Sequence, residues 1–327
     1  MNWNWIKLCG LVVWMIIHGF TTTGQPNKIR FAPQWTAQAQ FAGYYVALDK
    51  GFYTEAGLDV EILYPYAGKS VLNLLESEEV DVVSLFLTTG IQAKCNGVKL
   101  VNIGQLSQHA ATMLVARKSH GILKLSDLNG EKIAIWKSGF DELPRWLIAR
   151  NNLKVEWVPV LSSINLFLAG GVSAMAVMYY NEYDQIINSG IDESELSCFF
   201  LSDFGFDIPE DGLYCLEKTK KEKGELLAKF FQATLRGWEY ARSNPDYTID
   251  LVIAKMEQAH IPANHTHQKW MLEKVLELIK LGTKKVSPGE LSQQDFEETL
   301  NLLYQQGFIS ILIPYRDFFQ PVLKAIP

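Results

Sequence analysis

The sequence predicts an α/β protein in which two lobes enclose a cleft. Short apolar runs of β-strand character alternate with helical patterns along most of the 327 residues. Strands that are separated by single helices form βαβ units, so each lobe is expected to hold a mostly parallel sheet flanked by helices. A second observation is that the helical patterns after residue 218 follow one another without strands between them. That last region is therefore expected to cap an existing sheet.

The individual elements follow from the same alternation of patterns. Strands are expected at residues 29–33, 58–63, 81–85, 100–105, 111–116, 132–136, 155–159, 174–179, 198–201 and 212–216. Helices are expected at residues 41–50, 69–77, 89–96, 141–151, 181–189, 223–243, 247–258, 265–279 and 292–306.

The composition is that of a folded globular protein, with 48% hydrophobic and 20% charged residues. The length is enough for one large or two medium domains. The net charge of −6 argues against nucleic acid as a partner, because a phosphate backbone calls for a basic face.

The first 24 residues read as a signal peptide, so we expect an exported protein of the periplasm or cell envelope. Lys7 supplies positive charge, and the apolar run at residues 8–17 is about half the length that a membrane-spanning helix needs. Small residues at 21–24 favour cleavage after Gly24, with an uncleaved anchor as the alternative. Cys9 lies inside the apolar run, so the sequence does not support lipidation.

Three cysteines remain after such cleavage, namely Cys95, Cys198 and Cys215. An odd number allows at most one disulfide, for which Cys198–Cys215 is the expected pair, although the connectivity cannot be read from the sequence. There is no CxxC motif, and the histidines at 260, 265 and 267 do not share one clear helix face. We therefore expect no metal site.

Residues 31–53 are the most informative stretch of the chain. A short apolar strand leads into a polar, aromatic loop, and an amphipathic helix and a second strand follow. In open α/β sheets the carboxyl end of such a strand is where small ligands are held. Trp35 lies among polar residues in this loop, where its ring is placed to stack on a flat ligand.

This segment resembles the N-terminal signature of the NMT1/THI5-like family of periplasmic solute-binding proteins. The matching positions are Trp35, Gly43, Tyr44, Tyr45, Val46, Ala47, Lys50, Gly51, Phe52 and Tyr53, with Phe41 where the family has His. Residues 125–133 likewise resemble the phrase that opens the second lobe of exported binding proteins. The resemblance implies a two-lobed, type II periplasmic-binding-protein-like fold. We expect lobe 1 to comprise residues 25–116 and 203–327, and lobe 2 to comprise residues 117–202.

The candidate ligand-binding residues lie where expected strands end and helices begin. They are Trp35, Phe41, Tyr44, Phe86, Thr88, Thr89, Gln108, Ser138, Gly139, Tyr179, Tyr180 and Glu182. One of Tyr44 and Tyr45 is expected to face the cleft, and the resemblance favours Tyr44. The resemblance also favours Gln108, and it places an aromatic–Asn–Glu phrase at residues 180–182.

Ordinary structural roles compete with several of these assignments. Thr88 or Thr89 could simply cap a helix. Ser138 and Gly139 could present a hydroxyl and amides to a phosphate, a carboxylate or a ring carbonyl. Glu182 could pair with the edge of an aminopyrimidine or only face the positive end of its own helix.

The resemblance implies a binding protein that captures a small heteroaromatic ligand, such as a thiamine pyrimidine precursor or a related vitamin, for an ABC importer. A sensor that signals to a membrane partner is the alternative, and a degenerate cleft is a third possibility. The family also contains enzymes that make the thiamine pyrimidine with an active-site His and a Cys-rich motif. Phe41 replaces that His and no Cys cluster exists, so we expect neither an enzyme nor a cofactor.

Overall fold

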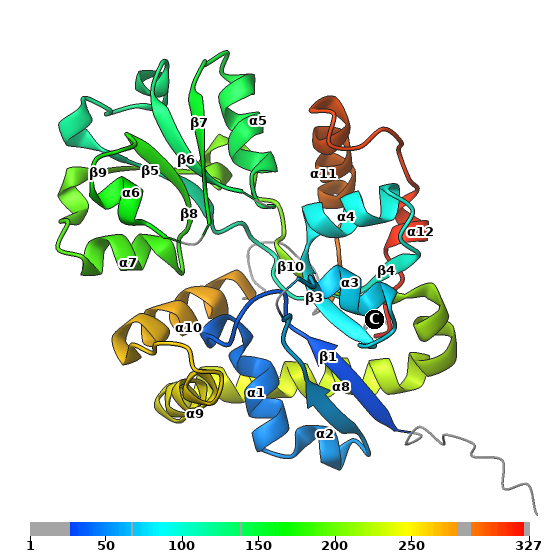
Figure 1. Cartoon of the computed structure of the whole chain (residues 1–327). Helices are drawn as coiled ribbons and strands as arrows, with labels where there is room; N and C mark the ends of the chain where they lie inside the picture. The colour runs from blue at the N-terminus through cyan, green and yellow to red at the C-terminus, as the bar shows by residue number, and fades with distance from the viewer. Residues whose placement is uncertain (1–26, 67, 138, 162, 280–288, 324–327) are drawn as a thin grey trace, which may run out of the picture.

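The computed structural model describes residues 27–66, 68–137, 139–161, 163–279 and 289–323 (Figure 1). The expected signal peptide and Ser138 lie outside these residues. Two five-stranded sheets form the centres of two lobes, and helices flank both sheets.

The first sheet is built from both ends of the chain. Its strands are β1 (Lys28–Ala32), β2 (Asp59–Ile62), β3 (Val82–Phe86), β4 (Leu100–Gln105) and β10 (Asp211–Leu216), in the order β2-β1-β3-β10-β4. β1 pairs in parallel with β2 and β3, whereas β10 runs antiparallel to both β3 and β4. Four strands therefore share one direction and β10 opposes them.

The second sheet is formed by one continuous stretch of chain. Its strands are β5 (Thr112–Arg117), β6 (Lys132–Trp136), β7 (Glu156–Val160), β8 (Ala174–Met178) and β9 (Leu196–Phe200), in the order β7-β6-β8-β5-β9. β6 pairs in parallel with β7 and β8, and β5 runs antiparallel to β8 and β9. The two sheets thus repeat one pattern, with a single reversed strand next to one edge.

The position of β5 corrects the expected lobe boundary at residues 116 and 117. Every residue of β5 pairs with β8 or β9, so the strand belongs to the second lobe. The chain therefore crosses between the lobes within residues 106–111, after β4. The return crossing lies between β9 and β10.

Each lobe has helices that follow its strands along the chain. In the first lobe they are α1 (Ala42–Asp49), α2 (Phe52–Glu55), α3 (Val71–Glu76) and α4 (Leu87–Cys95), and in the second α5 (Glu142–Arg150), α6 (Asn165–Leu168) and α7 (Glu182–Asn188). After β10 come α8 (Glu217–Ser243), α9 (Pro245–Gln258), α10 (His265–Ile279), α11 (Gln293–Gln305) and α12 (Tyr315–Phe318). Figure 1 shows α8 crossing beneath the first sheet and α10 reaching toward α7 of the second lobe.

The core of the first lobe is aromatic and closely packed. The rings of Phe31 and Tyr44 stack with centroids 4.3 Å apart, and Tyr53 stacks on Phe230 of α8 at 5.2 Å. A Cβ atom added at Gly237 would lie 2.0 Å from the carbonyl oxygen of Gly43. Contact between α1 and α8 at this distance requires glycine.

The expected disulfide is not formed. Cys95, Cys198 and Cys215 are all free thiols. Cys198 lies on β9 in the second sheet, whereas Cys215 lies on β10 in the first, so the two belong to different lobes. In the described parts of the chain, no helix combines the length and apolar character needed to cross a bilayer.

Candidate ligand-binding site

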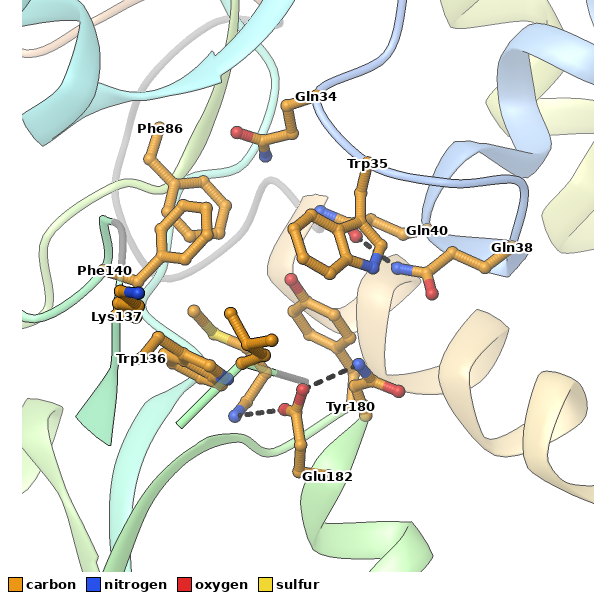
Figure 2. Close-up of a pocket in the computed structure, with 13 residues that line it drawn as sticks. Gln34, Trp35, Gln38, Gln40, Phe86, Trp136, Lys137, Phe140, Tyr180 and Glu182 are labelled. Carbon is orange, nitrogen blue, oxygen red and sulfur yellow. Dashed lines mark hydrogen bonds between the residues drawn. The ribbon is translucent and has the colours of Figure 1, made fainter. Parts of the chain in front are cut away.

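A pocket of about 710 Å³, counted with the part that opens to solvent, lies between the lobes (Figure 2). Its walls come from the loop after β1, the end of β3, and the segments that follow β6, β7 and β8. The lining residues are Gln34, Trp35, Gln38, Gln40, Phe86, Trp136, Lys137, Phe140, Leu161, Met178, Tyr180, Asn181 and Glu182. These segments leave the carboxyl ends of strands in both sheets, which is where open α/β sheets hold ligands.

Aromatic rings make up much of the wall. Trp35 is 40% exposed and faces the cavity, where Figure 2 shows it beside the buried ring of Tyr180. Phe86 of the first lobe meets Phe140 of the second edge-to-face, with centroids 4.5 Å apart. Phe140 in turn packs edge-on against Trp136 at 5.9 Å. Flat faces on several sides suit a planar ligand that can stack.

Glu182 supplies a carboxylate to the pocket wall. It is the first residue of α7 and is 6% exposed. One carboxylate oxygen accepts the backbone N–H of Met178 at 3.0 Å, and the other accepts the Asn181 side-chain amide at 3.0 Å. Burial raises the pKa of Glu182 to about 7, although these hydrogen bonds oppose the rise. Each oxygen keeps a lone pair that can accept from a ligand.

A second carboxylate fixes the amides of the first lobe. Asp211, at the start of β10, accepts hydrogen bonds from the side-chain amides of Gln34 and Gln40, the latter at 2.9 Å. Gln40 then accepts from the amide of Gln38 at 2.7 Å. Burial raises the pKa of Asp211 to about 6, while the two amides lower it. This network holds three pocket amides in defined orientations.

Four of the residues proposed from the sequence line this pocket, and they come from both lobes. Trp35 and Phe86 belong to the first lobe, and Tyr180 and Glu182 to the second.

Phe41 and Tyr44 lie elsewhere, because the start of α1 faces the core. Phe41 is 1% exposed, and Tyr44 is 2% exposed and stacked on Phe31. Tyr45 is buried as well, with its hydroxyl 2.8 Å from that of Tyr64. The expectation that one of the two tyrosines faces the cleft is therefore wrong.

The threonines after β3 are also outside the pocket lining. α4 begins at Leu87 with Phe86 as its N-cap, so Thr88 and Thr89 lie within its first turn. No side chain caps this helix, so neither threonine has the capping role considered above.

The remaining candidates have other surroundings. Gln108 is buried and donates to the backbone carbonyls of Gln105 and Glu290 at 3.2 and 3.0 Å. Tyr179 packs against Tyr183, Phe200 and Trp270. Gly139 is exposed, with a φ of 80°, in the turn that carries Lys137 and Phe140 into the pocket.

Sequence reasoning did not select nine of the lining residues, namely Gln34, Gln38, Gln40, Trp136, Lys137, Phe140, Leu161, Met178 and Asn181. The sequence feature that these residues share is their position, because each ends a strand or follows the carboxyl end of one. Within the described ranges, no group of three or more His, Cys, Asp or Glu side chains is arranged to hold a metal ion.

Two lobes, two crossings and a pocket between them define the periplasmic binding protein fold. The periplasmic aliphatic sulphonate binding protein SsuA from Escherichia coli shares this fold, with a TM-score of 0.68 over 90% of this chain and 93% of its own, at 18% identity. The sequence profile described as NMT1/THI5 like matches residues 38–248, which is more than half of the chain. The protein therefore belongs to the NMT1/THI5-like family.

The curated relatives include a protein named for thiamine biosynthesis, binding proteins, and pyrimidine phosphate synthases. The formylaminopyrimidine-binding protein of Halalkalibacterium halodurans is 22% identical over 302 residues, which cover 88% of each chain. The 4-amino-5-hydroxymethyl-2-methylpyrimidine phosphate synthase of Legionella pneumophila is 22% identical over 249 residues, or 72% of this chain and 76% of its own. Because both relatives are 22% identical to this chain, the choice between a binding role and a synthase role depends on the residues of the pocket.

Proposed function

We propose that the protein is an exported solute-binding protein that captures a thiamine pyrimidine precursor of the aminopyrimidine type for an ABC importer. The observation that carries this proposal is the combination of aromatic walls with the buried carboxylate of Glu182 in one interlobe pocket. The name of the relative from Halalkalibacterium halodurans supports the same ligand class.

An aminopyrimidine has a planar ring and an exocyclic amine, and the pocket has groups that suit each of them. Its planar ring can stack on Trp35 and Tyr180, which present large faces at low cost in side-chain entropy. Its exocyclic amine donates hydrogen bonds, and Glu182 has free lone pairs to accept them. A protonated ring nitrogen beside the amine would make that contact bidentate and charge-assisted.

The charges of the pocket favour an unphosphorylated ligand. Among the described residues that line the pocket, Lys137 has the one basic side chain. Glu182 stands in the wall and Asp211 lies directly behind the amides of Gln34 and Gln40. A phosphate between these carboxylates would be repelled, and this repulsion is strong where water is excluded.

A binding role fits the site better than a synthase role. Phe41 occupies the position at which the family signature has His, and its side chain lies in the core instead of the pocket. A hydrocarbon ring offers no acid, base or metal ligand. The chain therefore lacks the acid, base or metal ligand that a synthase would use at this position.

A thermal-shift panel on residues 25–327 tests the proposal. We would use 4-amino-5-hydroxymethyl-2-methylpyrimidine, its phosphate, formylaminopyrimidine, thiamine and riboflavin. A ligand at about 100 times its dissociation constant stabilises the native state by about 2.7 kcal/mol, which appears as a raised melting temperature. We expect shifts with the unphosphorylated pyrimidines.

Two variants and a control make the panel specific. Trp35→Ala and Glu182→Ala should each lose the pyrimidine shift. Leu123→Ala, at a residue of the second lobe that is 69% exposed and outside the pocket, should keep it. A wild-type protein that responds to none of the pyrimidines would refute the assignment.

A further inference from the structure

Helix α10 touches the polar groups of both pocket walls through two consecutive residues. The buried side chain of Gln268 accepts the backbone N–H of Ala39 at 2.7 Å. Ala39 lies between Gln38 and Gln40, so this bond ties α10 to the first-lobe wall. His267 points the other way, to α7 of the second lobe.

The contacts of His267 lead to the pocket carboxylate. Its Nδ1 lies 2.6 Å from Oδ2 of Asp184, and its Nε2 lies 3.2 Å from Oδ1 of Asn181. Oδ1 of Asn181 also accepts from Gln185 at 2.9 Å. Asn181 thus turns its oxygen toward Gln185 and His267 and donates from its amide nitrogen to Glu182, 3.0 Å away.

Packing one turn further along α10 strengthens the same contact between lobes. The indole N–H of Trp270 donates to the backbone carbonyl of Tyr179 at 3.1 Å, and the ring packs on Tyr179 with centroids 5.4 Å apart. Lys274 lies over the Trp270 ring at 4.9 Å. These groups hold α10 against the second lobe beside the pocket.

We propose that His267 is a positioning residue for ligand binding, although it does not line the pocket. It holds Asn181, and through Asn181 the carboxylate of Glu182, in the orientation that accepts the ligand. Because His267 belongs to the first lobe and Asn181 to the second, this orientation is complete only when the lobes are together. Affinity is thereby coupled to closure. The affinity part of this inference rests on the proposed function.

The first experiment needs no ligand. The backbone N–H of Met178 donates to Glu182, so its hydrogen exchange reports whether the carboxylate is in place. In the ligand-free protein we expect His267→Ala to speed this exchange and His267→Gln, which keeps one amide donor, to restore part of the protection. His265→Ala is the matched control, since His265 lies on the same helix, is exposed, and faces Asp250 of α9.

The second experiment measures affinity by calorimetry with the unphosphorylated pyrimidine that stabilises the wild type. We expect about a tenfold or greater loss for His267→Ala, a smaller loss for His267→Gln, and none for His265→Ala. A double-mutant cycle with Glu182→Gln should show non-additive losses, because the two residues act through one hydrogen-bonded chain.

The outcomes separate this inference from the function it builds on. Unchanged Met178 exchange in both His267 variants overturns the positioning role, whatever the ligand. Additive losses in the cycle also overturn it, since they would mean that His267 acts independently of Glu182. A wild type that binds no pyrimidine refutes the proposed function alone, and the Met178 exchange then decides the role of His267.

Discussion

Glu182→Gln should make the ligand-free protein more stable at neutral and alkaline pH while weakening its affinity for the ligand. Burial raises the pKa of Glu182 from 4.5 to about 7, so the folded protein keeps a proton that the unfolded chain loses. The contribution of Glu182 to stability is therefore fully present below pH 4.5 and is lost as the pH rises through 7. The shift corresponds to about 3 kcal/mol.

A glutamine at position 182 carries no charge, so it avoids the cost of a buried carboxylate at high pH, but it has only one acceptor oxygen. Glu182 accepts one hydrogen bond on each oxygen, from Met178 and from Asn181. Losing one of them costs about 1 kcal/mol. At pH 8 the variant should then be about 2 kcal/mol more stable than the wild type, and at pH 4 about 1 kcal/mol less stable.

Urea unfolding at pH 4, 6 and 8, with and without pyrimidine, measures both effects. Glu222→Gln is the control, because Glu222 is an exposed residue of α8. It should show neither the gain at pH 8 nor the loss of affinity. A Glu182→Gln variant that is less stable than the wild type at pH 8, or whose stability difference does not change with pH, would refute the reasoning.

Four further substitutions separate binding from packing. Trp35→Ala should weaken pyrimidine affinity about tenfold or more by calorimetry, with little change in urea unfolding because the side chain is 40% exposed. Equal affinity would contradict stacking on this ring. Tyr44→Ala should cost about 3–5 kcal/mol of unfolding free energy, since the ring is buried against Phe31. Any effect on the affinity of the folded fraction would count against its placement in the core. Gly237→Ala should cost about 2 kcal/mol or more through its clash with the α1 backbone. Gly224→Ala, on the same helix with open space around it, should instead stabilise by about 0.5 kcal/mol or more; similar results for both glycines would contradict the close approach of α1 and α8.

The strands and long helices could be predicted from the sequence, because a strand and an amphipathic helix each impose a period on nearby residues. All ten expected strands overlap observed ones. The four-residue helices α2, α6 and α12 were missed, because so short a stretch does not complete a recognisable pattern. The sequence pattern predicts that this long helix begins at residue 223, whereas α8 begins at Glu217. The backbone at Lys223 is non-helical, so the helix is interrupted at the residue where the pattern begins.

The sheet to which a strand belongs is a long-range property that its own residues do not encode. β5 is an apolar strand that would suit either lobe, and only its partners β8 and β9 place it in the second. The same dependence on long-range contacts limits what the sequence predicts about the pocket. Their positions after strand ends place Trp35 and Glu182 in the pocket lining. The rotation of α1, which turns Tyr44 into the core, depends instead on contacts with Phe31 and Trp238.

The place of β10 in the first sheet sets the order in which the lobes can be completed during synthesis. β10 lies between β3 and β4, although it comes after the entire second sheet in the chain. Until residues 211–216 leave the ribosome, β3 and β4 have no strand to join them. The second lobe, whose strands all lie within residues 112–200, can assemble from its own segment alone. A nascent chain would thus carry a finished second lobe attached to an unfinished first one, with open strand edges that a chaperone could recognise.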